Sequence, residues 1–267
     1  HTAIALFPTN GGTRGASGRA SDTADTLAFC RPAGVCGTRL VMVTLAGDFS
    51  DPFDAAKRTL FETMGYTVTA LLYSATQASY DAAAAANDVM YLSDSVGLNS
   101  STAGARARVE ALGVVSESTG GWDSLMYSGS SSSGASAGTT LDIVSNTHMI
   151  TRPFGLGTLT VFASDQGRGY WTGALPSGAQ LLGQVGTGAF LTVFDRGAAL
   201  FSSNTAAGRR VLLGTANSDP AAWNGNLKLM LSRTLGFASC SLSTAVTLMS
   251  FEALPGNGAV DLLWRTG

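Results

Sequence analysis

A recurring strand-then-helix pattern begins at residue 39 and constrains the fold more than any other feature of the sequence. Leu40 to Leu45 is a continuous, mostly apolar run, as expected for a central strand buried on both faces of a sheet. Ser50-Asp51-Pro52 then supplies a helix N-cap and a first-turn proline, and Gly65 ends the helix. The apolar residues expected on one face of this helix are Phe53, Ala56, Leu60 and Met64.

The same unit recurs twice, over residues 67–86 and 88–113, and a fourth strand begins at Val114. Strands connected through helices form right-handed crossovers and pair in parallel. We therefore predict an α/β fold with a doubly wound, mostly parallel sheet and helices on both faces. Residues 128–138, SGSSSSGASAG, predict a flexible loop, and the shorter strands after it predict an antiparallel extension.

Three regions follow from this pattern. Residues 1–38 are predicted to be an N-terminal arm, because their Gly/Ser/Arg-rich stretch is too polar to form a core. Residues 39–238 are predicted to be the α/β domain. Residues 239–267 contain two alternating strands around the turn LPGNG and are predicted to form a C-terminal β-hairpin.

An isolated hairpin is marginal in water, so its apolar faces need a partner sheet from this chain or from another copy. Residues 2–7 add a further short apolar strand, and only 13% of the residues are charged. The leading hypothesis is a secreted, catalytically inert structural subunit that forms an extracellular filament or surface array by exchange of terminal β-strands. The expected assembly residues are Ile4, Leu6, Val246, Leu248, Phe251, Val260, Leu262 and Trp264.

Charge and hydropathy exclude several classes of partner. The formal net charge is −2 and no basic run occurs, so nucleic-acid binding is not expected. No run of 18 apolar residues occurs, so no membrane span is expected. With 2 histidines in the chain, His-rich metal chemistry is not expected either, and no cofactor is predicted. The expected partners are further copies of the chain, with carbohydrate as a candidate ligand.

Cysteine usage favours a location outside the cytoplasm. Cys30 and Cys36 enclose a short Pro/Gly loop in which a disulfide could form, and two buried thiols are the alternative. Cys240 is then either a buried thiol or an intermolecular bridge. A chain that starts at His1 is consistent with a processed mature protein, so the expected location is extracellular or at the cell surface. Asn99-Ser100-Ser101 is a formal N-glycosylation sequon.

Two segments carry resemblances to known families. The stretch GRRVLLGTANSD, followed by the helix NGNLKLMLSRTLGFA, resembles the class I glutamine amidotransferase-like, flavodoxin-like fold, especially its trehalose-utilisation-type branch, over residues 39–238. The family's glutaminases need a cysteine on a strand-to-helix elbow. The corresponding stretch, residues 114–121, has none, so glutaminase activity is not expected. The C-terminal hairpin resembles the first two strands of a fibronectin type III-like module of secreted bacterial proteins.

A serine could formally replace that cysteine. Ser116 or Ser118 at the elbow, with His148 as base and Asp142 or Glu117 as orienting acid, would complete a nucleophilic set. No G-x-S-x-G motif surrounds either serine, and a hydrogen-bonded histidine in a turn is the favoured role of His148.

Three acids lie near the expected carboxyl ends of the parallel strands, where open α/β sheets bind their ligands. These residues, Asp48, Asp94 and Glu117, could hold a cation or sugar hydroxyls, although capping and loop solvation are the favoured roles. Together with His148 they define the alternative hypothesis, a secreted hydrolase or carbohydrate-binding domain. A pocket that holds at least three of the four side chains would support it.

Overall fold

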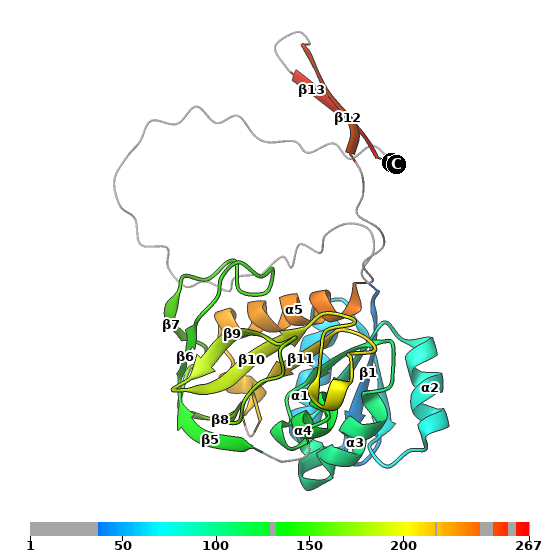
Figure 1. The fold of residues 1–267 in the computed structure, drawn as a ribbon, viewed down its shortest axis with the longest axis vertical. Helices are drawn as coiled ribbons and strands as arrows, with labels where there is room; N and C mark the ends of the chain where they lie inside the picture. Colours follow the sequence, from blue (N-terminus) through cyan, green and yellow to red (C-terminus); the bar gives the residue numbers. More distant parts are fainter. Residues whose placement is uncertain (1–36, 129–131, 217, 241–247, 256–259, 267) are drawn as a thin grey trace.

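The computed structural model describes residues 37–128, 132–216, 218–240, 248–255 and 260–266, and it is built around an 11-stranded sheet (Figure 1). One half of this sheet is parallel and has the strand order β2-β1-β3-β4-β11. The five strands are β1 (Arg39–Thr44), β2 (Thr67–Leu72), β3 (Val89–Leu92), β4 (Gly113–Ser116) and β11 (Arg210–Leu213).

The other half of the sheet is antiparallel. Beyond β11 the order continues with β10 (Gly188–Phe194), β9 (Gln180–Val185), β6 (Thr140–Ile143) and β7 (Gly157–Thr160). A branch pairs β5 (Ser133–Gly138) with β8 (Gln166–Trp171), which meets β10 at Ala189 and Trp171.

The prediction of a doubly wound, mostly parallel sheet with helices on both faces is therefore wrong for this sheet, which is mixed and rich in strands. The sheet is mixed because the strands from β5 to β10 follow one another through loops, without a crossover helix between them. Strands connected in this way pair antiparallel, because only a long crossover returns the chain in the parallel direction. The predicted loop at residues 128–138 contains β5, so it is also a strand in part.

Five α-helices accompany the sheet: α1 (Pro52–Thr63), α2 (Gln77–Ala86), α3 (Ser100–Ala107), α4 (Trp122–Met126) and α5 (Gly225–Ser239). They contribute to two hydrophobic clusters that receive alternate residues of β1. Leu40 packs in the cluster that includes Phe61 of α1 and residues of α5. Val41 packs in the cluster that includes Tyr80 of α2 and residues of α3 and α4. Because successive side chains of a strand point to opposite faces of the sheet, β1 contributes residues to both clusters.

The start of α1 is as predicted from the sequence. The Asp51 carboxylate accepts hydrogen bonds from the backbone N–H groups of Phe53 and Asp54, at 2.9 and 3.0 Å, and Pro52 occupies the first turn. The buried face is rotated from the predicted one, since Asp54, Lys57 and Phe61 are buried while Phe53 is 48% exposed. The charged side chains of Asp54 and Lys57 are therefore buried, although the apolar pattern placed neither residue on the buried face of α1.

The predicted C-terminal hairpin is present as β12 (Leu248–Pro255) and β13 (Val260–Thr266). These strands pair with each other in a two-stranded sheet separate from the 11-stranded one, with Phe251 opposite Trp264 and Pro255 opposite Val260. Cys240 ends α5 and is disulfide-bonded. Residues 1–36 of the predicted arm lie outside the described residues, and so do five of the predicted assembly and disulfide residues: Ile4, Leu6, Cys30, Cys36 and Val246.

None of the helices in the described part of the chain combines the length and the apolar character that a membrane crossing requires.

Candidate functional site

A buried polar network lies at the carboxyl ends of the parallel strands. Glu117 directly follows β4 and Ser93 directly follows β3, while Lys57 reaches the same place from α1. Glu117 is 0% exposed and Lys57 is 3% exposed, so both charges are removed from water. Burial of a charge is costly unless it is paired and hydrogen-bonded, which makes the partners of this pair decisive.

Glu117 has a donor for each carboxylate oxygen. The Lys57 ammonium pairs with Oε1, which also accepts the backbone N–H of Asp94 at 2.7 Å. Oε2 accepts the hydroxyl of Tyr91 at 2.8 Å and the hydroxyl of Thr215 at 3.1 Å. Residues at or near the ends of three neighbouring strands, together with Lys57 of α1, are thereby held at one carboxylate.

Lys57 has fewer acceptors than protons. Besides Glu117, its ammonium donates to the Ser93 hydroxyl at 3.2 Å. The Asp54 carboxylate is 3.9 Å from the ammonium, which is too far for a hydrogen bond. Within the described residues, two acceptors therefore serve an ammonium group that carries three protons.

The exclusion of water from this network shifts the pKa values of Asp54 and Tyr91. Burial raises the pKa of Asp54, and the hydrogen bond from Ser93 and the charge of Lys57 oppose that rise only in part. Burial also raises the pKa of Tyr91, and the nearby Glu117 charge adds to the effect. The phenol is therefore a firm donor to Glu117 at any physiological pH.

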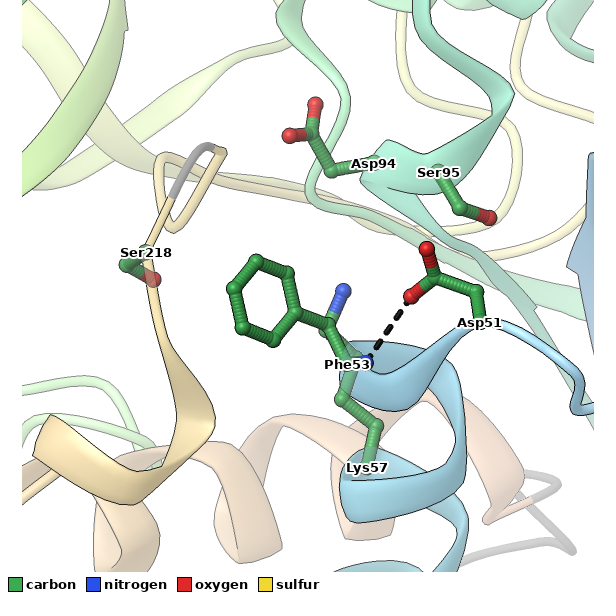
Figure 2. Close-up of a pocket in the computed structure, with 6 residues that line it drawn as sticks. All are labelled: Asp51, Phe53, Lys57, Asp94, Ser95 and Ser218. Carbon is green, nitrogen blue, oxygen red and sulfur yellow. Dashed lines mark hydrogen bonds between the residues drawn. The ribbon is translucent and has the colours of Figure 1, made fainter.

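A cavity of about 130 Å³ opens above this network. Figure 2 shows the Lys57 ammonium pointing into the space between Asp51, Asp94, Ser218 and the Phe53 ring. Among the described residues, no group of three or more His, Cys, Asp or Glu side chains could hold a metal ion. The cavity is lined by Asp51, Phe53, Lys57, Asp94, Ser95 and Ser218.

Local hydrogen bonds fix the polar groups at the cavity. The Asp51 carboxylate is held by its N-cap bonds to α1. The Ser218 hydroxyl donates to the carbonyl of Thr215 at 2.6 Å and accepts the indole N–H of Trp223 at 2.8 Å. Preorganised groups of this kind bind a ligand without a large ordering cost.

Two of the three predicted rim acids, Asp94 and Glu117, lie at the cavity or directly beneath it. Asp94 lines the cavity, and its backbone N–H donates to Glu117 directly beneath. Asp48 follows β1 at the same edge, but its carboxylate accepts the N–H and hydroxyl of Ser50 at 3.0 and 2.6 Å. These hydrogen bonds lower the pKa of Asp48. Its role is that of a loop-capping residue.

His148 lies elsewhere. Its ring packs edge-on against Phe237 near the end of α5, at 4.8 Å between centroids, and its Nδ1 accepts the N–H of Ile150. Arg209, which precedes β11, donates to the carbonyl of Phe237, so this region belongs to the opposite edge of the parallel strands. Burial lowers the pKa of His148.

The other members of the hypothetical serine set are also separated. The Ser116 hydroxyl is buried and donates to the carbonyl of Ser118, which is itself 3% exposed. Asp142 on β6 accepts the hydroxyl of Thr158 on β7 at 2.7 Å. The structure does not assemble these residues with His148 into a nucleophilic site. Of the four residues of the alternative hypothesis, Asp94 lines the cavity and Glu117 is buried beneath it, so the expected pocket with three of these side chains is not present.

The residue that sequence reasoning missed is Lys57. One signal was available: Asp54, Lys57 and Phe61 follow helical spacing, and Lys57 is one of only two lysines in the chain, the other being Lys228. A lysine within the stripe of a helix that packs on a sheet indicates a buried ion pair. Its partner, Glu117, lies 60 residues further along the chain and could not be assigned without the tertiary structure.

No protein-family model and no curated protein matches this chain. Among solved structures, it is similar to the Cytoplasmic Protein STM3548 from Salmonella typhimurium, with 9% identity over 76% of this chain and 100% of that chain, and a TM-score of 0.49. A likeness of this size carries no inference about activity. That protein's name describes it as cytoplasmic, which differs from the extracellular or cell-surface location expected for this chain. The mixed sheet likewise departs from the amidotransferase-like α/β fold that the resemblance implied.

Proposed function

We propose that this protein binds a small polyhydroxylated ligand of the carbohydrate class in the cavity above Lys57. The observation that carries the proposal is the Lys57 ammonium, which points into a cavity that Asp51 and Asp94 also line. A hydroxyl group both accepts and donates hydrogen bonds. It can accept from the ammonium and donate to a carboxylate at the same time, which a purely cationic or purely anionic group cannot do.

The charge balance favours a neutral ligand. The positive charge of Lys57 is matched by Glu117 within the buried network. Two further carboxylates, Asp51 and Asp94, line the cavity, and like charges beside them disfavour carboxylate and phosphate ligands. The ammonium itself disfavours a cation placed beside it. A polyol avoids both costs.

Shape supports the same ligand class. The cavity of about 130 Å³ is close in size to a cavity of about 150 Å³ that holds benzene, so it has room for part of one sugar ring with its hydroxyl groups. The 48% exposed ring of Phe53 lies at the mouth and offers an apolar face on which the C–H face of a sugar ring can rest.

Binding of monosaccharides, measured by isothermal titration calorimetry, tests this proposal. We expect at least one of glucose, galactose, mannose and ribose to bind in the micromolar to millimolar range. Asp94→Asn should weaken that binding by about tenfold or more, because a hydrogen bond to a charged group contributes about 1.5–3 kcal/mol.

The matched control is Asp165→Asn, which removes an exposed carboxylate outside the cavity and should leave the dissociation constant unchanged. The proposal is wrong if none of the four sugars binds at millimolar concentration. Equal weakening by both substitutions would also contradict it, because the effect would then not come from the cavity.

A second function rests on a different observation. Among the described residues, β12 and β13 pair only with each other and stay separate from the 11-stranded sheet, so each strand has one backbone edge that this sheet does not pair. We propose that the hairpin adds to a sheet of another copy, which supports assembly of a homo-oligomer or polymer. The backbone edge is the basis of this proposal.

Deletion of residues 244–267 is expected to abolish self-association and to leave the 11-stranded sheet folded, because that sheet contains no strand from the deleted segment. Light scattering after size-exclusion chromatography measures the mass, and circular dichroism checks the fold. A full-length chain that stays monomeric at high concentration would refute the assembly proposal. So would an assembly that survives the deletion.

A further inference from the structure

Three strands lie at the edges of the 11-stranded sheet, and each has one side on which no other strand of the described chain pairs. They are β2 and β7 at the two ends of the strand order and β5 at the end of its branch. An unpaired edge presents backbone N–H and C=O groups that can bind a further strand. The state of these groups decides which edge can receive a partner.

Side chains already occupy part of the edges of β7 and β5. On the side of β7 away from β6, the carbonyl of Thr160 accepts the side-chain amides of Asn224 and Asn226 at 3.0 and 2.9 Å. On the side of β5 away from β8, the carbonyl of Ala137 accepts the Arg168 guanidinium at 2.6 Å. An incoming strand would have to displace these donors, so neither edge is ready to receive one.

The outer backbone groups of β2 are open. The N–H groups of Thr67 and Tyr73, at the two ends of this strand, donate to carbonyls at the two ends of β1 at 2.7 and 3.0 Å. Because alternate residues of a strand direct their backbone groups to opposite sides, those of Val68 and Ala70 point away from β1. Within the described part of the chain, no hydrogen bond reaches these two residues from that side.

The sequence of β2, TVTALL, carries none of the features that usually protect an edge. It contains no proline and no charged residue, and it pairs with β1 in an unbroken register over six residues. Monomeric proteins protect their edges with lysine, proline, bulges or very short strands, since an open edge invites pairing with another chain. The edge of β2 is therefore suited to receive a strand.

We infer that β2 receives the C-terminal hairpin of a second copy, and that β13 is the hairpin strand that pairs with it. This inference rests on the second proposed function, assembly through the hairpin, and adds the edge that the hairpin meets. β13 is favoured over β12 because β12 has a bulge between Leu248 and Ser250 and ends at Pro255, which has no N–H to donate. β13 spans seven residues without proline, enough to cover the six residues of β2.

A contact between β13 of one copy and β2 of the next joins two different surfaces. The first copy then still has an open β2, and the second still has an open hairpin. Contacts of this kind continue from copy to copy, so the assembly is a ring or an open filament.

Ala70→Pro tests the receiving edge. Proline removes the outward N–H and places its ring where the incoming strand would lie, while the hydrogen bonds from β2 to β1 are retained. We expect the concentration needed for association, measured by light scattering, to rise about tenfold or more. Ala70→Thr is the matched control, because it changes the same side chain but keeps the N–H. It should shift that concentration by less than about threefold.

Amide hydrogen exchange of the full chain, followed by NMR after quenching, needs no variant. In the monomer, the amides of Val68 and Ala70 should exchange quickly, whereas those of Thr69 and Leu71, which face β1, should exchange slowly. Association should slow the exchange of Val68 and Ala70 by about tenfold or more. If these two amides are already protected in the monomer, the chain covers its own edge and the inference is overturned.

A mixing experiment separates this inference from the proposed hairpin function. The Ala70→Pro chain keeps its hairpin, and the chain without residues 244–267 keeps an open β2. Each should be monomeric alone, and the mixture should form one-to-one pairs. If the deletion abolishes association while Ala70→Pro does not, the hairpin meets another edge, so the inference fails while the second proposed function stands. If association survives the deletion, both fail.

Discussion

Lys57→Met is expected to lower the free energy of unfolding by about 3–5 kcal/mol, the usual cost of leaving one member of a buried ion pair without its partner. Glu117 is 0% exposed and would keep the hydroxyls of Tyr91 and Thr215 but lose its ammonium. Asp54 is also buried and would lose the only cation within 4 Å among the described residues. Urea denaturation, followed by circular dichroism, measures the change.

Two further variants separate charge pairing from loss of packing. Lys57→Met combined with Glu117→Gln removes both charges and should recover a large part of the lost stability, because no unpaired charge then remains between these two positions. Lys228→Met replaces the other lysine, which is only partly buried on α5, and should change stability by less than about 1 kcal/mol. A loss below about 1 kcal/mol for Lys57→Met would contradict this prediction, because a loss of that size is typical of an exposed ion pair.

Arg210→Met is expected to destabilise the fold by about 3 kcal/mol or more, since several buried hydrogen bonds with a charged donor are lost at once. Arg210 is 1% exposed, and its guanidinium donates to the carbonyls of Arg108, Glu110 and Leu112 at 3.0, 2.7 and 2.9 Å. It also donates to the carbonyl of Arg209 at 2.9 Å. Burial lowers its pKa to about 10, so the group is still protonated at neutral pH.

The fork shape of the guanidinium is part of this prediction. Arg210→Lys keeps the charge but offers a compact ammonium that cannot reach the same carbonyls, so it should lose most of the stability as well. Arg58→Met is the control, because Arg58 is 46% exposed and forms a surface pair with Glu62 that contributes about 1 kcal/mol or less. Thermal and urea unfolding provide the measurements. An Arg210→Lys variant as stable as the parent protein would contradict the argument.

Local signals predicted the individual elements of the parallel half. The apolar run at β1 and the Asp51-Pro52 cap of α1 depend on interactions between residues close in sequence, and both occur where the sequence placed them. An antiparallel extension was predicted, but its extent was underestimated, because every strand from β5 to β10 pairs antiparallel. The choice between parallel and antiparallel pairing depends on which strand lies beside which, and β10 lies between β11 and β9 through contacts that no local pattern encodes.

The candidate site also contains residues that the sequence predicted and residues that only the structure revealed. Asp94 could be placed near the cavity from the sequence, since residues that follow parallel strands gather at one edge of a sheet. His148 could not be excluded, because its position beside Phe237 depends on the packing of α5. Lys57 was passed over because an isolated lysine in a helix is usually exposed, and only the long-range pairing with Glu117 makes its burial possible.

The sequence by itself determined the alternation of strands and helices in the parallel half, and which acids follow the strands, because capping, periodicity and burial preference act over a few neighbouring residues. The tertiary structure alone decided that the sheet is mixed and that Lys57 meets Glu117 beneath a cavity. The physical reason is distance along the chain: the cost of burying each charge is met by a partner 60 residues away, and only the folded sheet brings the two together.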